Sequence, residues 1–258
     1  MDFPVISQDS VIAFTLVLLR VGSLVGTMPL FGEGIVPVRA KVGLSLLIAL
    51  LLFPTVSPGL PAVPEPSIPL LFRMVSEILI GVTLGFAARL VFAAAQVAGE
   101  MIGFKIGFSV ANVIDPISSI QISLIGQFQY LLAVLIFLVT NSHHVFFAAI
   151  ADSFRIVPLF TFHLSGDLMK IILDLSRDMF VLAVKICIPV VAAIMFTNVG
   201  LGIVARTVPQ INVLIVGFPL QIMIGLVFFG LSMPLFASLL QQAFGRLGHS
   251  VYSLLKVM

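Results

Sequence analysis

The chain has 258 residues, of which 60% are apolar and only 9% are charged. Soluble domains carry about 25% charged residues, so this composition indicates a membrane-class protein. The 13 basic and 11 acidic residues leave a net charge of +2 and no basic patch, which excludes a nucleic-acid-binding surface of the usual kind. The single cysteine, Cys187, cannot form an internal disulfide.

Hydropathy predicts six apolar helical runs, near 11–31, 42–60, 78–98, 130–151, 179–199 and 211–237. A helix of about 20 residues crosses the hydrocarbon of a bilayer, so several runs are long enough to span it. The second run is shortened by Pro54 and Pro58, and the fourth is cut by the polar stretch 140–144. Lys and Arg between the runs divide six against four, which sets no orientation. We therefore expect an all-α protein built from packed helical hairpins, with an unusual topology.

Two polar stretches separate these runs. Residues 54–69 contain six prolines among sixteen residues, and we expect an extended linker there. Ser165-Gly166-Asp167 has the composition of a helix start. Lys170, Asp174 and Asp178 follow at intervals of four and predict one solvated helix face.

The stretch from Gly99 to Ile120 combines a glycine strip with a helix break. Gly99, Gly103 and Gly107 recur every four residues, so on a helix they would form a narrow strip against which another helix packs closely. Pro116 disfavours the α conformation at Asp115. In a protein this apolar, a non-helical segment is tolerated only where protein buries it or where it lines a cavity. This segment is therefore the first candidate for function.

Charges within apolar runs are the other candidates, because each is costly in lipid. They are Arg20, Arg89 and Lys185. Arg89, Gln96 and Glu100 fall on one helix face, and since Arg89 and Glu100 are about three turns apart, their partners must lie on other helices or chains. Either they join helices or they take part directly in transport.

The sequence shows no catalytic, nucleotide-binding or metal-binding motif. Adjacent His143 and His144 would point to different helix faces, so we interpret them as part of a polar turn. We expect no enzyme activity, no cofactor and no metal site.

Two separated motifs resemble one known family. Glu77 to Gly85, EILIGVTLG, continues through Ala95-Gln96-Val97-Ala98-Gly99-Glu100 to Asp115-Pro116 and looks like the central signature of the FliR family, called SctT in injectisomes. Gly200 to Asn212, GLGIVARTVPQIN, with Gly217-Phe218-Pro219, is similar to the C-terminal signature of that family. Length and hydropathy agree over nearly the whole chain.

The resemblance implies one all-helical export-gate domain over 1–258, which joins FliP-like and FliQ-like subunits as the single copy in a heteromeric helical ring. Residues 1–178 would be the FliP-like portion and 179–258 a FliQ-like hairpin with a tail. FlhB- and FlhA-like proteins would be further partners, beside unfolded substrates in transit and membrane lipid. The ring would belong to the bacterial inner membrane at the flagellar basal body, partly on its periplasmic side.

The resemblance also assigns roles to residues. A pore plug maps onto about 106–122, with an apolar seal that needs no charge because dewetting blocks ions. The residues assigned to this plug or gate are Phe104, Ile106, Gly107, Phe108, Val110, Val113, Ile114, Asp115, Pro116, Ile117 and Ile120. Those assigned to helix packing or subunit contact are Glu77, Gly81, Gly85, Arg89, Gln96, Gly99, Glu100, Gly103, Arg206, Pro209, Gln210 and Asn212.

The predicted function is a channel subunit of the flagellar type III export apparatus. Three alternatives remain open. An injectisome gate subunit would have the same pattern. A secondary transporter would bind a solute at the broken segment 107–120 and predicts inverted repeats, which the sequence lacks. An intramembrane enzyme is disfavoured, since no pair of catalytic groups can be placed.

Overall fold

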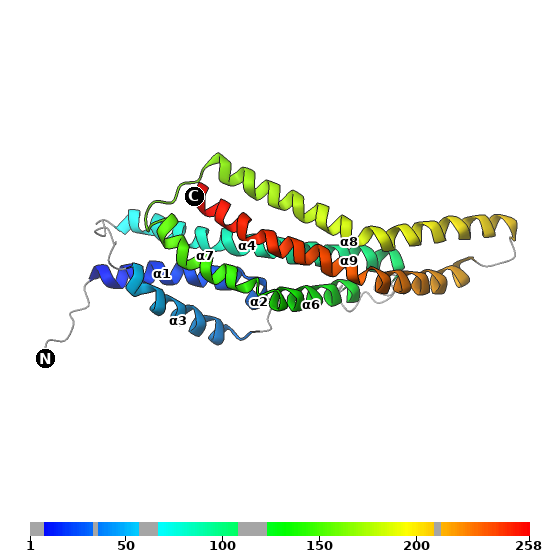
Figure 1. The fold of residues 1–258 in the computed structure, drawn as a ribbon, viewed down its shortest axis with the longest axis horizontal. Helices are drawn as coiled ribbons and strands as arrows, with labels where there is room; N and C mark the ends of the chain where they lie inside the picture. Colours follow the sequence, from blue (N-terminus) through cyan, green and yellow to red (C-terminus); the bar gives the residue numbers. More distant parts are fainter. Residues whose placement is uncertain (1–7, 33–35, 57–66, 108–122, 209–212) are drawn as a thin grey trace. The chain divides into compact units, whose positions relative to one another are not determined.

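The computed structural model describes residues 8–32, 36–56, 67–107, 123–208 and 213–258. All regular elements in these ranges are helices (Figure 1). They are α1 (Gln8–Thr27), α2 (Pro29–Gly32), α3 (Val38–Val56), α4 (Ser67–Ile106), α6 (Leu124–Val139), α7 (His143–Ile156), α8 (Gly166–Thr207) and α9 (Val213–Val257). The prediction of an all-α fold is confirmed.

The helices divide into two units. The first comprises 1–90, 141–175 and 246–258, and the second comprises 91–140 and 176–245. Three long helices, α4, α8 and α9, contribute residues to both units.

The first unit packs α1 against α3 and α4. The rings of Phe14 and Phe53 meet edge to face with centroids 5.6 Å apart. On α4, a Cβ atom added to Gly81 would collide with Ser23 and the backbone of α1, and one added to Gly85 would collide with Thr27. The hydroxyls of Ser23 and Thr27 donate to carbonyls of their own helix, so both side chains are small and hydrogen-bonded where α4 approaches. Small residues on both helices therefore allow this close approach.

The C-terminal residues complete the first unit through polar contacts. The Tyr252 hydroxyl donates to the Asp152 carboxylate at 2.6 Å, joining α9 to α7. Ser165 donates to the Val257 carbonyl at 2.9 Å and accepts from the Leu168 amide at 3.1 Å. The second of these bonds caps α8, so the predicted helix start at Ser165-Gly166 is confirmed.

A buried aromatic cluster joins α4, α6 and α9 in the second unit. Phe92 of α4 contacts Phe137 of α6 and Phe244 of α9, with ring centroids 5.3 and 5.4 Å apart. Phe137 and Phe244 also meet each other at 5.2 Å. These three rings are fully or nearly fully buried, and edge-to-face or tilted pairs of this kind add to the stabilisation from burial.

Five helices in the described ranges are long and apolar enough to cross a membrane, or six if the bent pair α6–α7 counts as one span. The predicted break at Thr140–His144 is confirmed as a 66° bend between these two helices. The helices α4, α8 and α9 have 40, 42 and 45 residues, so each is about twice the length that crosses hydrocarbon.

The expected bounds of the long helices are too short, and the expected linker 54–69 is too long at both ends, while its residues 57–66 lie outside the described ranges. The apolar runs 78–98, 179–199 and 211–237 mark only parts of α4, α8 and α9, because polar and charged residues extend each helix outside its apolar stretch. Prolines also lie inside helices: Pro189 in α8, and Pro219 and Pro234 in α9. At the predicted linker 54–69, Pro54 belongs to the last turn of α3 and Ser67–Pro69 begin α4, where the missing proline N–H has no intrahelical partner to lose.

Candidate functional site

The glycines of α4 and α6 bring these helices into backbone contact. A Cβ atom added to Gly99 would lie 2.5 Å from the Cα atom of Gly126 and 2.8 Å from its nitrogen. One added to Gly103 would lie 3.0 Å from the Ser123 hydroxyl oxygen. Ser123 in turn caps α6, because its hydroxyl accepts from the Gly126 amide. Gly99 and Gly103 therefore form the predicted close-packing strip.

Gly107 does not continue this strip, because α4 ends at Ile106. Gly107 has φ +97°, a conformation that favours glycine, and its amide donates to the Phe104 carbonyl at 3.2 Å. A Cβ atom added there would lie 3.5 Å from the Phe218 ring of α9. Ile106 is fully buried, whereas Phe104 is 68% exposed. Phe218 therefore lies beside the residue at which the chain leaves α4. Ser123, the residue before α6, lies beside Gly103.

Most of the predicted plug lies outside the described residues. This holds for Phe108, Val110, Val113, Ile114, Asp115, Pro116, Ile117 and Ile120. Pro209, Gln210 and Asn212 also lie outside the described residues, while Arg206 is exposed in the last turn of α8.

A buried ion pair lies in the first unit, and one of its members, Glu77, begins the first of the two sequence motifs. Arg20 of α1 and Glu77 of α4 are 0% and 1% exposed, and the Arg20 Nε atom lies 2.5 Å from Glu77 Oε2. Arg20 Nη1 donates to the carbonyl of Ser153 at 3.1 Å and to that of Val157 at 2.9 Å. Arg20 therefore joins three separate segments, α1, α4 and the end of α7.

Aromatic rings and a turn complete the surroundings of this pair. The Arg20 guanidinium carbon lies 4.4 Å from the centre of the Phe154 ring, a cation–π contact. The Phe160 backbone hydrogen-bonds Glu77, and Phe160 itself has φ +79°, which an L-residue rarely adopts. Its ring lies 4.2 Å from the Arg73 guanidinium carbon. The turn is thus held by contacts that outweigh its backbone strain.

Sequence reasoning identified Arg20 as costly and Glu77 as a packing residue but did not pair them. Fifty-seven residues separate them, and no local spacing rule links positions on two helices. The available signal was compositional: Glu77 is the first acidic residue after Glu65 and lies in an apolar helix, as Arg20 does. Two opposite charges in apolar surroundings favour each other as partners.

The predicted polar stripe of α4 is present on one continuous helix. Arg89 and Glu100 are exposed, and Gln96 donates to the Glu100 carboxylate at 3.2 Å. Lys185 is also exposed. Within the described ranges the one ion pair is that of Arg20 with Glu77, so Arg89 and Lys185 present their charges outward.

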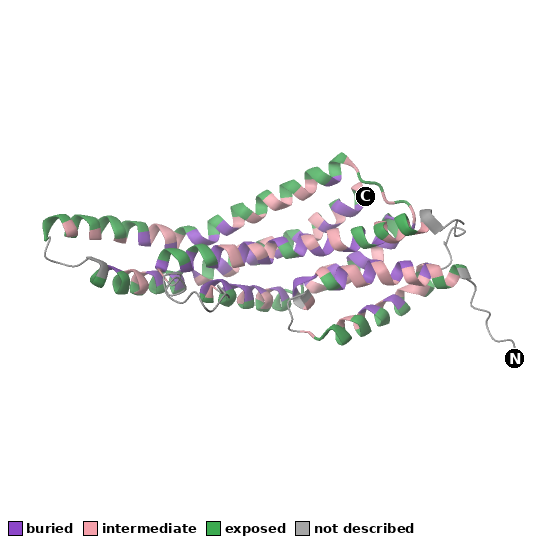
Figure 2. Ribbon diagram, turned by 180° about the vertical axis from the view of Figure 1, so that it is seen from behind, coloured by how far each residue is buried: buried purple, intermediate pink, exposed green. Residues whose placement is uncertain are grey.

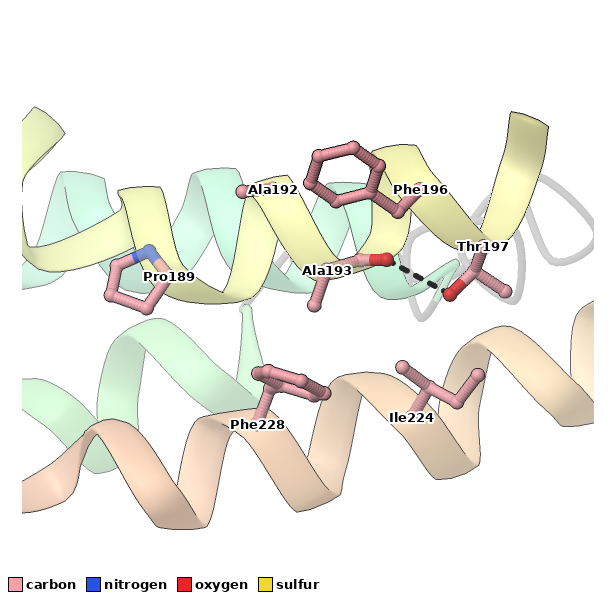
Figure 3. Close-up of a pocket in the computed structure, with 7 residues that line it drawn as sticks. All are labelled: Pro189, Ala192, Ala193, Phe196, Thr197, Ile224 and Phe228. Atoms are coloured by element: carbon pink, nitrogen blue, oxygen red, sulfur yellow. Dashed lines mark hydrogen bonds between the residues drawn. The ribbon is translucent and has the colours of Figure 1, made fainter. Parts of the chain in front are cut away.

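An apolar slot lies between α8 and α9 in the second unit (Figure 3). It has a volume of about 420 Å³. The Thr197 hydroxyl, its one polar side-chain group, donates to the Ala193 carbonyl at 2.9 Å. The slot therefore offers no free side-chain group to orient a polar solute or to perform acid–base chemistry. Its lining residues are Pro189, Ala192, Ala193, Phe196, Thr197, Ile224 and Phe228.

The described part of the chain contains no cluster of three metal-ligating side chains. His143 and His144 begin α7 beside each other, with ring centroids 4.3 Å apart. They lie at the polar break between α6 and α7, as predicted.

Large apolar side chains remain exposed along α3, α8 and α9 (Figure 2). Covering such a side chain with protein or lipid is worth about 1.5–3 kcal/mol, so these faces favour an apolar environment. Examples on α3 are Val38, Val42, Leu47 and Leu51, and examples on α9 are Ile215, Met223, Val227 and Leu231.

Comparison with known proteins assigns the chain to a family. Residues 11–247 match the family described as bacterial export proteins, family 1. The flagellar biosynthetic protein FliR of Bacillus subtilis is 39% identical over 83% of each chain. FliR of Escherichia coli is 32% identical over 89% of this chain and 87% of its own, and FliR of Aquifex aeolicus is 31% identical over 90% and 89%. The chain therefore belongs to the bacterial export proteins, family 1, and is an all-helical, membrane-class relative of the flagellar FliR proteins.

Proposed function

We propose that the chain is the FliR-type subunit of a flagellar type III export gate, a non-enzymatic component of the channel through which unfolded proteins leave the cell. It assembles as one copy with FliP-like and FliQ-like subunits, beside FlhB- and FlhA-like proteins, in the inner membrane and partly on its periplasmic side. The three relatives reported above are all named as flagellar proteins, which favours the flagellum over an injectisome.

The observation that best supports an assembled rather than solitary protein is its charge and surface distribution. Arg20 and Glu77 pair with each other in the interior, whereas Arg89, Lys185 and the apolar faces of α3 and α9 are exposed. A subunit that packs into a helical ring needs such outward faces. A solitary solute transporter would instead need polar groups facing a central site, and the slot between α8 and α9 has none free.

Within this gate, the segment 106–122 is the pore seal. Its support is the fixed geometry of its two borders, Gly107 held beside Phe218 and Ser123 held beside Gly103. An apolar segment between two packed borders can close a narrow constriction, and exclusion of water from that constriction blocks ions.

Complementation tests the function directly. Expression of this chain in a Bacillus subtilis strain that lacks its own FliR should restore flagellar protein export and motility. If this chain inserts into the membrane of that strain but export is not restored, the assignment is contradicted.

Conductance tests the seal. Placing Asp at Phe108 or Val110, or deleting 117–119, should raise ion conductance of the assembled complex, because a charge brings water into the constriction and a shorter loop leaves a gap. Lys170→Ala and Asp174→Ala, on the exposed face of α8, are the controls and should leave conductance unchanged. Unchanged conductance in loop variants that still assemble would place the seal in the partner subunits.

A further inference from the structure

The end of α4 packs against α9 at Gly225. The side chain of Ile106 lies where a side chain at position 225 would otherwise be. Ile106 is fully buried. A Cβ atom added to Gly225 of α9 would lie 2.5 Å from Ile106 Cγ1, closer than Cβ atoms approach other atoms, and 3.0 Å from Cδ1, a tight contact. Ile106 therefore occupies a notch that exists because residue 225 is glycine.

A second contact holds the next residue. Gly107 has φ +97°, and the Phe218 ring carbons lie 3.5 and 3.7 Å from where its Cβ atom would be. Phe218 and Gly225 are seven residues apart, two turns of α9, and so share one face of that helix. Phe218 and Gly225 of α9 thus meet two consecutive residues at the end of α4.

Among the described residues no side-chain hydrogen bond joins α4 to α9 at this point, so the contact between them is one of packed apolar surfaces. Packed side chains resist small displacements, because in a close-packed interior even a misfit the size of one methylene group lowers stability. A shift of α9 along or across α4 would therefore displace Ile106 and Gly107 together.

We propose that Gly225 and Phe218 are positioning residues for the gate: α9 sets the place of Ile106 and Gly107, and through them the border from which the seal begins. This inference rests on the proposed function, in which that border belongs to the pore seal. It assigns to the second half of the chain a direct part in keeping the channel closed, beyond packing against other subunits.

The test is a double-substitution cycle in the complex reconstituted with FliP- and FliQ-like subunits. Gly225→Ala should displace Ile106, raise ion conductance several-fold and speed amide hydrogen exchange at 102–107 without preventing assembly. Gly230→Ala is the matched control, because the same change on the same helix meets no atom within 4 Å, and it should alter neither readout.

With Ile106→Ala measured alone to complete the cycle, combining it with Gly225→Ala should bring both readouts closer to the wild type than Gly225→Ala alone does. The truncation removes the two clashing carbons and leaves Ile106 Cβ, which the new methyl would meet at 3.5 Å, an ordinary contact. Additive rather than compensating effects would overturn the positioning role, because a shape fit must couple the two sites.

The two readouts separate this inference from the seal itself. Unchanged exchange at 102–107 in Gly225→Ala would show that α9 does not position α4 and would refute the inference. Faster exchange with unchanged conductance would overturn the claim that this border controls closure, and it would count against the proposed seal as well. Leakage of every variant, including Gly230→Ala, would contradict a specific contact.

Discussion

At the scale of single residues, the pair Arg20–Glu77 determines how the first unit is held together. Both side chains are buried. Arg20 also donates hydrogen bonds to the carbonyls of Ser153 and Val157. A buried pair is worth little relative to apolar side chains that fill the same space, but loss of one partner leaves an uncompensated buried charge. The main effect of the pair is therefore to specify which segments pack together. Its net contribution to the free energy of unfolding is small.

Arg20→Met should lower the free energy of unfolding by about 3–5 kcal/mol, because Glu77 is then buried without its cation. The double variant Arg20→Met/Glu77→Met should recover most of that loss. Titration with a denaturing detergent in mixed micelles measures both. Arg89→Met, which changes an exposed arginine of α4, is the control and should shift stability by less than about 0.5 kcal/mol. Equal losses in the single and double variants would show that the arginine stabilises by some contact other than Glu77.

At the scale of helices, glycines of α4 allow it to pack closely against two different helices, α1 and α6. Gly81 and Gly85 admit Ser23 and Thr27 of α1 in the first unit, and Gly99 admits the backbone of Gly126 in the second. The tolerance at each glycine depends on what lies opposite. Backbone cannot move without shifting a helix, whereas a hydroxyl such as that of Ser123 beside Gly103 can rotate away.

Gly99→Ala should therefore cost more stability than Gly103→Ala, in the range of about 1–3 kcal/mol typical of overpacking. Gly200→Ala on α8 has open space around it and is the control, which should be neutral or slightly stabilising. Thermal unfolding of the reconstituted complex ranks the three variants. A larger loss for Gly200→Ala than for Gly99→Ala would remove the close-packing account.

The bulkier changes Gly103→Val and Gly107→Val should block assembly. Valine at 103 would force α4 away from Ser123 and Ile125, and valine at 107 would need a φ of +97° that a β-branched residue adopts only at high cost. The yield of complex after affinity purification reports this. Normal assembly of both variants would show that assembly does not require glycine at positions 103 and 107.

At the scale of the whole chain, local chemistry made some features predictable and long-range geometry hid others. The break at Thr140–His144 and the cap at Ser165 follow from polar residues at fixed offsets, and both are confirmed. The pairing of Arg20 with Glu77 and the notch at Gly225 depend on which helices meet, which no local pattern specifies. Helix lengths were predicted too short, because hydropathy detects only the apolar part of a helix such as α8, which runs from Gly166 to Thr207.

The outward charges and apolar faces predict that the chain is stable only with its partners. Arg89, Lys185 and the exposed side chains of α3 and α9 have no cover within the described structure. Purified alone, the chain should be heterogeneous and should lose structure faster than in the complex.

The most direct test of the account is co-purification of this chain, expressed with FliP-like and FliQ-like proteins, followed by native mass spectrometry of the complex. The account predicts one stable assembly that contains a single copy of this chain and that protects it from unfolding. Recovery of a well-folded monomer that gains no stability from the partner proteins, or of an assembly without this chain, would contradict it.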